Sequence, residues 1–538
     1  MNNFRLFLTR KPKNFNLLVG ITSVLILNLF LCFSFSLSNW FRISADLLIL
    51  IPFLIASAYI TTTRKFFLYF FISGIFILAI FRFLTKLLYD LFGLPFSYSE
   101  LFLINELRYL LEKSLSTFEI VLLISLGFLI LLSMFYFIRL LTEYACQAFS
   151  LSFKKTASGI LFGFVLISFT QLAIITVKKE DNPFHLTRGP LAVDLTIFIR
   201  DSINFWVNRD QIIKNLKSEN DLLLDKRYNL SLLNRSNLII IFIESYGALL
   251  VEDPNLSTAY ENLLSQVQLK LEKQSFSMIT GFSAAPQNSG LSHLSFSTGT
   301  KIYDQASARI AVGLDLTTLN QRFDHLGYLA LSVMPGVDQG HSEMESFFAF
   351  KEKIRFSDFS YPKDSVGWAN IPDQYALEWV GRKVNLKEIS PYFTEIVLSS
   401  SHSPYGIVPT YIDNGDFELK DYHSVIPSKN VSLGILSHLD STPEKYIISI
   451  KYSMSSAFDF IEKYLSPEDL IIVIGDHQPH AMRTKSNLVP VHIISGKKNL
   501  LIPFKKLGFH GEFSSLKAKQ HISHEDFAEF LLESYSSF

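Results

Sequence analysis

The chain has 538 residues, of which 49% are hydrophobic and 50 are phenylalanine, and its 49 basic residues balance its 49 acidic ones. This length allows two or three domains. Because the net charge is zero, nothing global favours a nucleic-acid partner, and we predict no nucleic-acid role. The high apolar content is typical of a protein that lies partly in a lipid bilayer.

Five apolar stretches early in the chain can cross the hydrocarbon core of a bilayer, which is roughly 30 Å thick. The first has a long apolar region and no evident cleavage site, so we interpret it as a retained anchor rather than a signal peptide. The second contains Pro52, which leaves a re-entrant segment as an alternative to a full span. The five stretches are Phe15–Leu37, Leu47–Ile60, Phe66–Phe83, Ile120–Ile138 and Ile160–Val177.

Basic residues cluster in alternate loops of this five-span arrangement. The positive-inside rule makes these loops cytoplasmic, so the chain from Lys178 onward is expected to be exported. We therefore predict an all-α transmembrane bundle of about five helices, residues 1–177. The basic residues are Arg5, Arg10, Lys11, Lys13, Arg64, Lys65, Arg139, Lys154 and Lys155.

Residues 178–235 are more polar and are predicted to form a linker. Within them, Leu195–Val207 is amphipathic, with Phe198 and Trp206 among its apolar residues. This stretch is interpreted either as a packed linker helix or as an interfacial helix that lies at the membrane surface.

Residues 236–538 alternate short β-branched runs with helical patterns, which is typical of a mostly parallel sheet covered by helices on both faces. The clearest strands are Leu238–Ile243, Ile396–Leu398 and Leu470–Ile474, and each leads into polar residues. We call the polar residues that follow each strand its tail. Because ligand sites of open α/β sheets form at the carboxyl ends of strands, we expect these three tails to lie close together.

Candidate metal ligands follow two of these strands. Asp476 and His477 place a carboxylate and an imidazole on one turn, a combination that suits a divalent metal. Taken alone, the position of Glu244 after the first strand favours a helix cap.

Only two cysteines are present, Cys32 and Cys146. The exported part therefore contains neither a disulfide nor a thiolate zinc site.

A serine-rich segment, Phe282–Gly299, leads into a helix that we predict to begin near Leu291. Ser289 would then lie near a helix amino end, where unpaired backbone N–H groups favour phosphate or sulfate. A serine-rich helix cap without chemistry is the alternative. No Walker loop, nucleophile elbow or His-Glu-x-x-His motif occurs elsewhere in the chain.

Together these motifs resemble the sulfatase-like branch of the alkaline phosphatase superfamily, which includes lipoteichoic acid synthases and phosphoglycerol and phosphoethanolamine transferases. The resemblance covers most of Asn237–Phe538 and implies an alkaline phosphatase-like α/β domain. Asn237–Gly247 resembles the family's first strand, which implies that Glu244 binds the catalytic metal. Ile474-Gly-Asp-His-Gln-Pro resembles the family's Asp-His pair, which implies two further ligands, Asp476 and His477.

The resemblance also implies a nucleophile and substrate contacts. The family's nucleophile lies ten residues before a Thr-Gly pair, and counting back from Gly299 gives Ser289, which would also be the fourth metal ligand. His402 resembles the His-x-Pro element that contacts the transferred group. Further substrate-contact candidates are His293, Trp368 and Asp373.

Two departures from the family restrict the chemistry. Leu291 and His293 stand where a sulfatase needs Pro and Arg for oxidation to formylglycine, so sulfate ester hydrolysis is disfavoured. Lipoteichoic acid synthases use threonine as the nucleophile, so their glycerol phosphate chemistry does not carry over directly.

The function implied by the resemblance is transfer of a phospho-head group, of the phosphoglycerol or phosphoethanolamine type. The donor is a membrane phospholipid, the acceptor an envelope glycan or lipid, and the intermediate a phosphoserine. The expected cofactor is a divalent ion, Mn²⁺ or Zn²⁺. The expected location is the bacterial plasma membrane, multi-pass, with the catalytic domain on the periplasmic or extracellular side.

Three alternatives remain open. The first is a phosphodiesterase, phosphatase or sulfuric ester hydrolase of the same superfamily, with water as acceptor. The second is a catalytically silent protein that binds the envelope. The third is a transporter, which is disfavoured because no charged residue lies mid-span in a clear relay.

Overall fold

The description rests on a computed structural model of the chain. It covers residues 7–32, 43–59, 64–92, 98, 101, 116–152, 187–188, 191–224, 227–337, 346–361, 371–384, 391–403, 405, 408–413, 442–479, 482, 486–511 and 521–537. Contacts divide the chain into two compact units. The first consists of Met1–Tyr89 and Pro95–Trp206, and the second of Asp90–Leu94 and Val207–Phe538.

The first unit is built from long apolar helices. Among the described residues, three stretches have the length and composition to cross a membrane: Lys13–Leu31, Arg64–Thr85 and Thr117–Leu151. The predicted second span corresponds to a 15-residue helix that contains Pro52, and the predicted fifth span, Ile160–Val177, lies outside the described residues. The elements are α2 (Lys13–Leu31), β1 (Ile43–Ser44), α3 (Ala45–Tyr59), α4 (Arg64–Phe92), α6 (Thr117–Ser152) and β2 (Thr187–Arg188).

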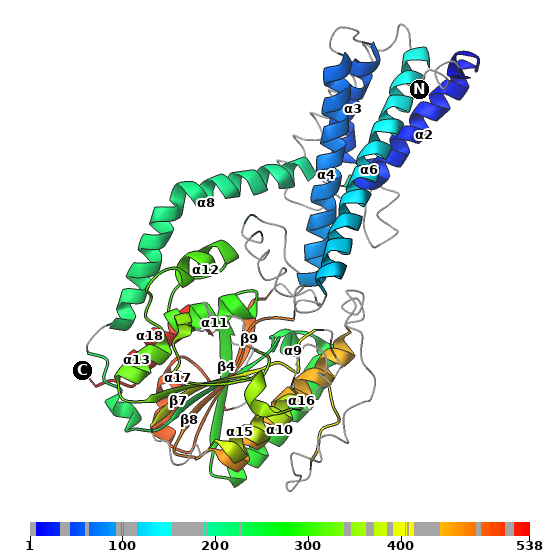
Figure 1. Ribbon diagram of the computed structural model, residues 1–538. Coiled ribbons are helices and arrows are strands. Elements are labelled where there is room, and N and C mark those ends of the chain that lie inside the picture. The colour runs from blue at the N-terminus through cyan, green and yellow to red at the C-terminus, as the bar shows by residue number, and fades with distance from the viewer. Residues whose placement is uncertain are drawn as a thin grey trace. The chain divides into compact units, whose positions relative to one another are not determined.

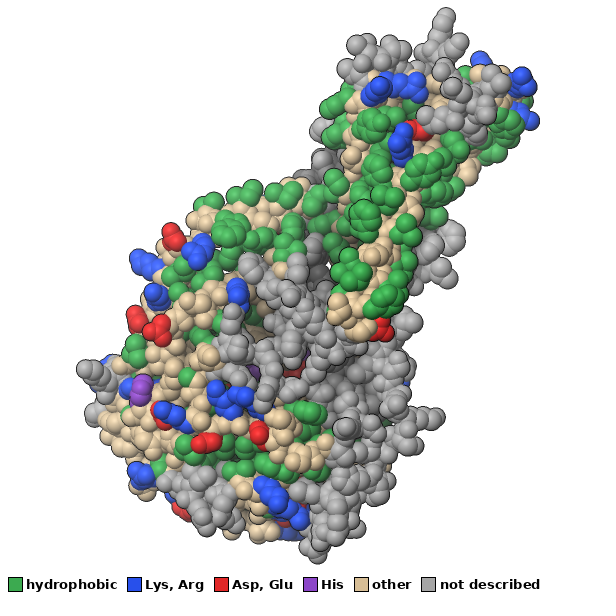
Figure 2. Space-filling view, in the orientation of Figure 1, with side chains coloured by type: hydrophobic (Ala, Val, Ile, Leu, Met, Phe, Trp, Pro, Cys, Tyr) green, Lys and Arg blue, Asp and Glu red, His purple; other side chains and the backbone are tan. Residues whose placement is uncertain are grey.

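Apolar side chains lie on the outside of these helices as well as between them. Figure 2 shows hydrophobic side chains over their outer surface, and on α6 Phe118 and Phe128 are more than two-thirds exposed. Leu27, Phe71 and Ile138 are fully buried between the helices. Helices that are apolar all round are typical of a membrane segment.

Helix α8 (Leu191–Asn220) includes the predicted amphipathic stretch. In the first unit, Phe198 packs edge-on against Phe81, with ring centroids 6.0 Å apart. In the second unit, the side chain of Asn220 donates to the carbonyls of Thr298 and Thr317 at 2.8 and 2.7 Å. Trp206 is exposed. Both interpretations of the linker remain predictions.

The described residues of the second unit form an eight-stranded sheet in the order β10-β4-β9-β8-β3-β7-β5-β6. Every neighbouring pair is parallel except those that involve β9, which is antiparallel to β4 and β8. The predicted mostly parallel sheet is confirmed. The strands are β3 (Leu238–Ile243), β4 (Ser277–Ala284), β5 (Leu329–Met334), β6 (Glu352–Arg355), β7 (Tyr392–Leu398), β8 (Leu470–Gly475), β9 (Leu488–Ser495) and β10 (His521–Ser523).

Helices cover both faces of this sheet, as Figure 1 shows. Leu238 and Phe242 of β3 belong to the core shared with α11, α13, α17 and α18, whereas Ile239 and Ile243 belong to the core shared with α10, α15 and α16. A strand buried on both faces needs a continuous apolar sequence, which β3 has. The helices are α9 (Leu249–Glu252), α10 (Pro254–Lys273), α11 (Ser289–Thr298), α12 (Gln305–Val312), α13 (Leu319–His325), α15 (Asp373–Lys383), α16 (Pro443–Tyr464), α17 (Ile502–Lys506) and α18 (His524–Ser534).

The strand register places the three predicted tails at one edge of the sheet. Ile243, the last residue of β3, is level with Leu398 of β7 on one side and Gly475 of β8 on the other. The residues that follow these three strands therefore emerge side by side.

Candidate metal and nucleophile site

The tails of β3 and β8 approach each other closely because of one glycine. A Cβ atom at Gly475 would lie 1.9 Å from the carbonyl oxygen of Tyr246, so no larger residue fits there. Ser245, between Glu244 and Tyr246, has a left-handed backbone with φ 56°. Its N–H donates to Oδ1 of Asp476 at 2.8 Å, which ties the two tails together.

Glu244, Asp476 and His477 form a buried cluster at this edge. Nε2 of His477 lies 3.2 Å from Oε1 of Glu244 and 3.5 Å from Oδ2 of Asp476. One ligand atom from each residue lies within 4.8 Å of the others. The three predicted metal-binding side chains are thus brought together, although their role as ligands remains a prediction.

Ser289 completes the cluster from helix α11. Its Oγ donates to Oε2 of Glu244 at 3.1 Å and lies 3.1 Å from Nε2 of His477. The helix begins at Ser289, earlier than the predicted start near Leu291, because Asn288 caps it by accepting from the N–H of Leu291 at 3.0 Å. Ser289 therefore lies at the helix amino end, as expected.

The charges of the cluster shift the pKa values of its members. Burial acts to raise the pKa of Glu244, but the charges of His477 and His402 outweigh it and hold that pKa well below its ordinary value. Burial and the charge of Glu244 raise the pKa of Asp476 to about 7. Burial acts to lower the pKa of His477, but the carboxylates of Asp476 and Glu244 raise it to about 9.

The residues present fit a divalent metal ion. Oδ2 of Asp476 is buried and has no hydrogen-bond partner within the described part of the chain. Nδ1 of His477 lies 2.7 Å from the carbonyl oxygen of Gln478 and donates its hydrogen there, so Nε2 faces the carboxylates. A carbonyl that accepts from the second ring nitrogen is the usual arrangement behind a metal-binding histidine. Two carboxylates and one imidazole suit zinc or manganese.

The tail of β7 lies beside this cluster. Oγ of Ser401 donates to the carbonyl oxygen of Glu244 at 2.6 Å. Nδ1 of His402 lies 2.6 Å from the carbonyl oxygen of Ser403, and the charge of His402 acts on Glu244. The predicted convergence of the three strand tails is therefore observed, and a contact from His402 to substrate remains a prediction.

The other predicted substrate contacts have different surroundings. The ring of His293 packs edge-on against Phe242 at 4.4 Å, and neither of its nitrogens has a hydrogen-bond partner within the described ranges. Burial lowers the pKa of His293 to about 4, so the ring is neutral. Asp373 is fully buried and binds backbone N–H groups. Trp368 lies outside the described residues.

Two residues that the sequence did not single out also shape the site. Oγ of Ser292 donates to the carbonyl oxygen of Asp476 at 2.5 Å. The hydroxyl of Tyr446 donates to the carbonyl of Ser245 at 2.8 Å and accepts from the N–H of Gly247 at 3.1 Å. Ser292 follows Ser289 by three residues on one helix, which is a weak signal of a shared face. Nothing in the sequence pointed to Tyr446.

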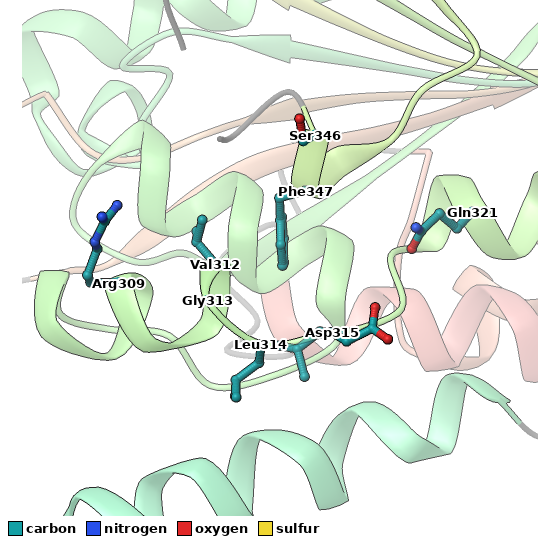
Figure 3. A pocket seen from close by; sticks show the side chains of 9 residues that line it. Arg309, Val312, Gly313, Leu314, Asp315, Gln321, Ser346 and Phe347 are labelled. Carbon is teal, nitrogen blue, oxygen red and sulfur yellow. The ribbon is translucent and has the colours of Figure 1, made fainter. Parts of the chain in front are cut away.

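A separate cavity of about 410 Å³ lies between the end of α12 and the start of α13 (Figure 3). None of the residues of the metal cluster lines it, so it is not part of the site. It is lined by Arg309, Val312, Gly313, Leu314, Asp315, Leu316, Gln321, Ser346 and Phe347.

Comparisons with known proteins find similarity only among solved structures. No family model and no curated protein sequence matches the chain. One similar structure is a protein in the alkaline phosphatase superfamily from Vibrio parahaemolyticus, at 17% identity and a TM-score of 0.35, covering 55% of this chain and 64% of that chain.

Two other similar structures have named activities or ligands. The C-terminal periplasmic domain of EptC from Escherichia coli, in complex with Zn, has 12% identity and a TM-score of 0.36, covering 55% of this chain and 80% of that chain. The phosphoglycerol transferase GacH from Streptococcus pyogenes, in complex with sn-glycerol-1-phosphate, has 14% identity and a TM-score of 0.35, covering 61% and 81%. These overlaps are partial.

Proposed function

We propose that this protein is a membrane-anchored, metal-dependent enzyme that transfers a phospho-head group from a membrane phospholipid to an envelope glycan or lipid. The head group is of the phosphoglycerol or phosphoethanolamine type. The observation that carries the proposal is the position of Ser289, whose Oγ lies 3.1 Å from both Oε2 of Glu244 and Nε2 of His477. A serine hydroxyl at a helix amino end, beside metal-binding groups, is arranged to become a nucleophile.

Glu244, Asp476 and His477 would hold a divalent metal, Mn²⁺ or Zn²⁺, with Ser289 as the fourth ligand. When bound, the metal would supply positive charge that favours the ionised serine and offsets negative charge on the phosphoryl oxygens. Two observations support this assignment: Oδ2 of Asp476 has no hydrogen-bond partner among the described residues, and Nε2 of His477 faces the carboxylates.

The side chains then have distinct roles in the transfer. Oγ of Ser289 gives up its proton and forms a bond to phosphorus, while the bond between phosphorus and the diacylglycerol oxygen breaks and that oxygen takes up a proton. The acceptor hydroxyl then gives up its proton, bonds to the phosphorus and displaces Oγ of Ser289, which regains a proton. The first backbone N–H groups of α11 would bind the phosphoryl oxygens, and His402 would contact the transferred group from the opposite tail.

The apolar helices of the first unit support a membrane-bound donor. Three described helices have the length and composition of membrane spans. A multi-pass protein of the bacterial plasma membrane, with residues 1–177 as anchor, 178–235 as linker and 236–538 on the periplasmic or extracellular side, would face donor lipids of the same leaflet.

The test is intact-mass analysis of the full-length protein in phospholipid nanodiscs. Phosphatidylglycerol and phosphatidylethanolamine are supplied in turn with Mn²⁺ or Zn²⁺, samples are quenched in acid, and Ser289→Ala is treated in parallel. We expect a head-group phosphate adduct on the unmodified protein, with the mass of one donor, and none on the variant.

Two other outcomes favour the alternatives. Release of the head group into water at an equal rate with and without an acceptor would indicate a hydrolase. No adduct and no released head group, in a protein that binds the metal, would contradict catalysis and favour a silent envelope-binding protein.

A further inference from the structure

Asp373, the first residue of helix α15, is fully buried and joins that helix to the tail of β7. Its Oδ1 accepts hydrogen bonds from the N–H of Ser399 at 2.9 Å and of Ser400 at 3.0 Å. Its own N–H donates to Oγ of Ser400 at 2.9 Å. Three hydrogen bonds therefore connect one residue of α15 to two successive residues of the tail.

The same tail reaches the metal cluster two residues later. Oγ of Ser401 donates to the carbonyl oxygen of Glu244 at 2.6 Å, and the N–H of His402 donates to the carbonyl of Ser399 at 3.1 Å. The tail is thus a turn held at its start by Asp373 and at its centre by the backbone of Glu244. His402 follows Ser401 directly in the chain, so its backbone is placed by the same turn.

We propose that Asp373 is a positioning residue that fixes His402 beside the metal cluster by binding the backbone of the β7 tail. The inference rests on the proposed function, in which His402 contacts the transferred group. Asp373 acts through His402 and does not touch substrate, because its side chain has no exposed surface and its Oδ1 accepts two N–H groups. A carboxylate oxygen that accepts two successive backbone N–H groups fixes the direction of the chain that bears them.

Substitutions of Asp373 separate this role from a direct one. Asp373→Ala leaves two backbone N–H groups without their acceptor, so the turn loosens. We expect kcat to fall roughly 10- to 100-fold, as for a displaced catalytic group, with little change in KM. Asp373→Asn keeps an acceptor oxygen at the same place and should restore most of kcat. Metal affinity should not change in either variant, because neither touches Glu244, Asp476 or His477.

Two adjacent serines provide a matched pair that does not depend on Asp373→Ala folding. Oγ of Ser400 accepts from Asp373, whereas Oγ of Ser399 has no hydrogen-bond partner in the described structure. Ser400→Ala should lower kcat by a smaller factor than Asp373→Ala, and Ser399→Ala should leave kcat unchanged.

The experiment uses full-length protein in phosphatidylglycerol nanodiscs with Mn²⁺. Head-group release gives kcat and KM, and hydrogen–deuterium exchange of residues 399–403 reports on the turn without any need for turnover. We expect faster exchange in Asp373→Ala and Ser400→Ala, and near-native exchange in Asp373→Asn and Ser399→Ala.

The two readouts distinguish failure of this inference from failure of the proposed function. Unchanged exchange in both Asp373→Ala and Ser400→Ala would overturn the inference, as would a loss of kcat in Asp373→Asn equal to that in Asp373→Ala. The expected exchange pattern in a protein that releases no head group would support the positioning of the turn and overturn the proposed transfer.

Discussion

Two buried histidines of the second unit have different hydrogen-bond partners and charged neighbours. His492, on β9, has a partner for each ring nitrogen: Oγ1 of Thr280 lies 2.8 Å from Nδ1, and the hydroxyl of Tyr246 lies 2.7 Å from Nε2. Burial lowers the pKa of His492 to about 3, so its ring is neutral. His477, after β8, faces two carboxylates that raise its pKa to about 9.

The difference separates a polar cluster whose hydrogen bonds are complete from the cluster proposed to bind the metal. The chain itself supplies the hydrogen bonds of His492, so that cluster needs nothing from outside. The cluster around His477 contains two carboxylates that repel each other, and Oδ2 of Asp476 lacks a hydrogen-bond partner in the described part of the chain. Two carboxylates and one imidazole gathered in a buried cluster are the arrangement expected of a metal site.

The largest expected effect is the loss of chemistry in Ser289→Ala. Removal of the nucleophile should lower the rate of head-group transfer by about 10⁴- to 10⁶-fold, because no covalent intermediate can form. Metal affinity should change little, since the three other ligands remain. The measurement is head-group release in nanodiscs, with Ser399→Ala as the control. Retention of more than about a tenth of the rate would rule out Ser289 as the nucleophile.

Substitution of His492 should affect stability and not chemistry. His492→Ala leaves the hydroxyl of Thr280 without its partner and opens a cavity, so the free energy of unfolding should fall by about 1–3 kcal/mol. Metal affinity should stay the same. Thermal unfolding of the full chain in detergent, with and without Mn²⁺, measures both quantities. A large loss of metal affinity in this variant would contradict the prediction, because it would show that metal binding depends on His492.

The smaller effect is a dependence of stability on pH. The pKa values of His492 and His524 are lowered to about 3 by burial, whereas an unfolded histidine titrates near 6.5. Below pH 6.5 the unfolded chain binds protons that the folded chain does not. The contribution of these two histidines to stability is therefore fully present above pH 6.5 and falls with decreasing pH, by roughly 1 kcal/mol per pH unit for each histidine.

Comparison of variants isolates this effect. The titration of Asp476 has the opposite effect on stability, because its folded pKa of about 7 lies above its ordinary value of 3.8. Its contribution to stability therefore rises as the pH falls below 7. His492→Gln should make the loss of stability between pH 6.5 and 5 shallower than in the unmodified protein. An equal slope in the two proteins would show that His492 is not held neutral in the folded state.

The sequence predicted the parts of the fold and site that depend on local patterns. The continuous apolar run Leu238–Ile243 coincides with β3 because a strand buried on both faces allows no polar residue. Asp476 and His477 were predicted because they follow such a strand, whereas the metal-binding role of Glu244 was predicted only through the resemblance to a family. Ser289 was found only through the resemblance to a family, since a serine-rich helix start has no chemistry by itself.

What the sequence did not predict depends on long-range contacts. The antiparallel course of β9 leaves no mark on its own apolar pattern. Tyr246 and His492 are 246 positions apart, and nothing in either neighbourhood indicates the other. Asp373 was predicted as a substrate contact because of the segment in which it lies, whereas its hydrogen bonds to Ser399 and Ser400 depend on how α15 packs beside β7.

The most direct test of the account is a metal titration of the full-length protein by equilibrium dialysis, with Mn²⁺ and Zn²⁺, beside Asp476→Asn and His492→Gln. Asp476→Asn keeps the oxygen that accepts from the N–H of Ser245 and removes one of the two carboxylates proposed to bind the metal. We predict that the unmodified protein and His492→Gln bind the metal equally, and that Asp476→Asn binds it roughly 100-fold more weakly or worse. Equal affinity in all three proteins would contradict a metal site at Glu244, Asp476 and His477.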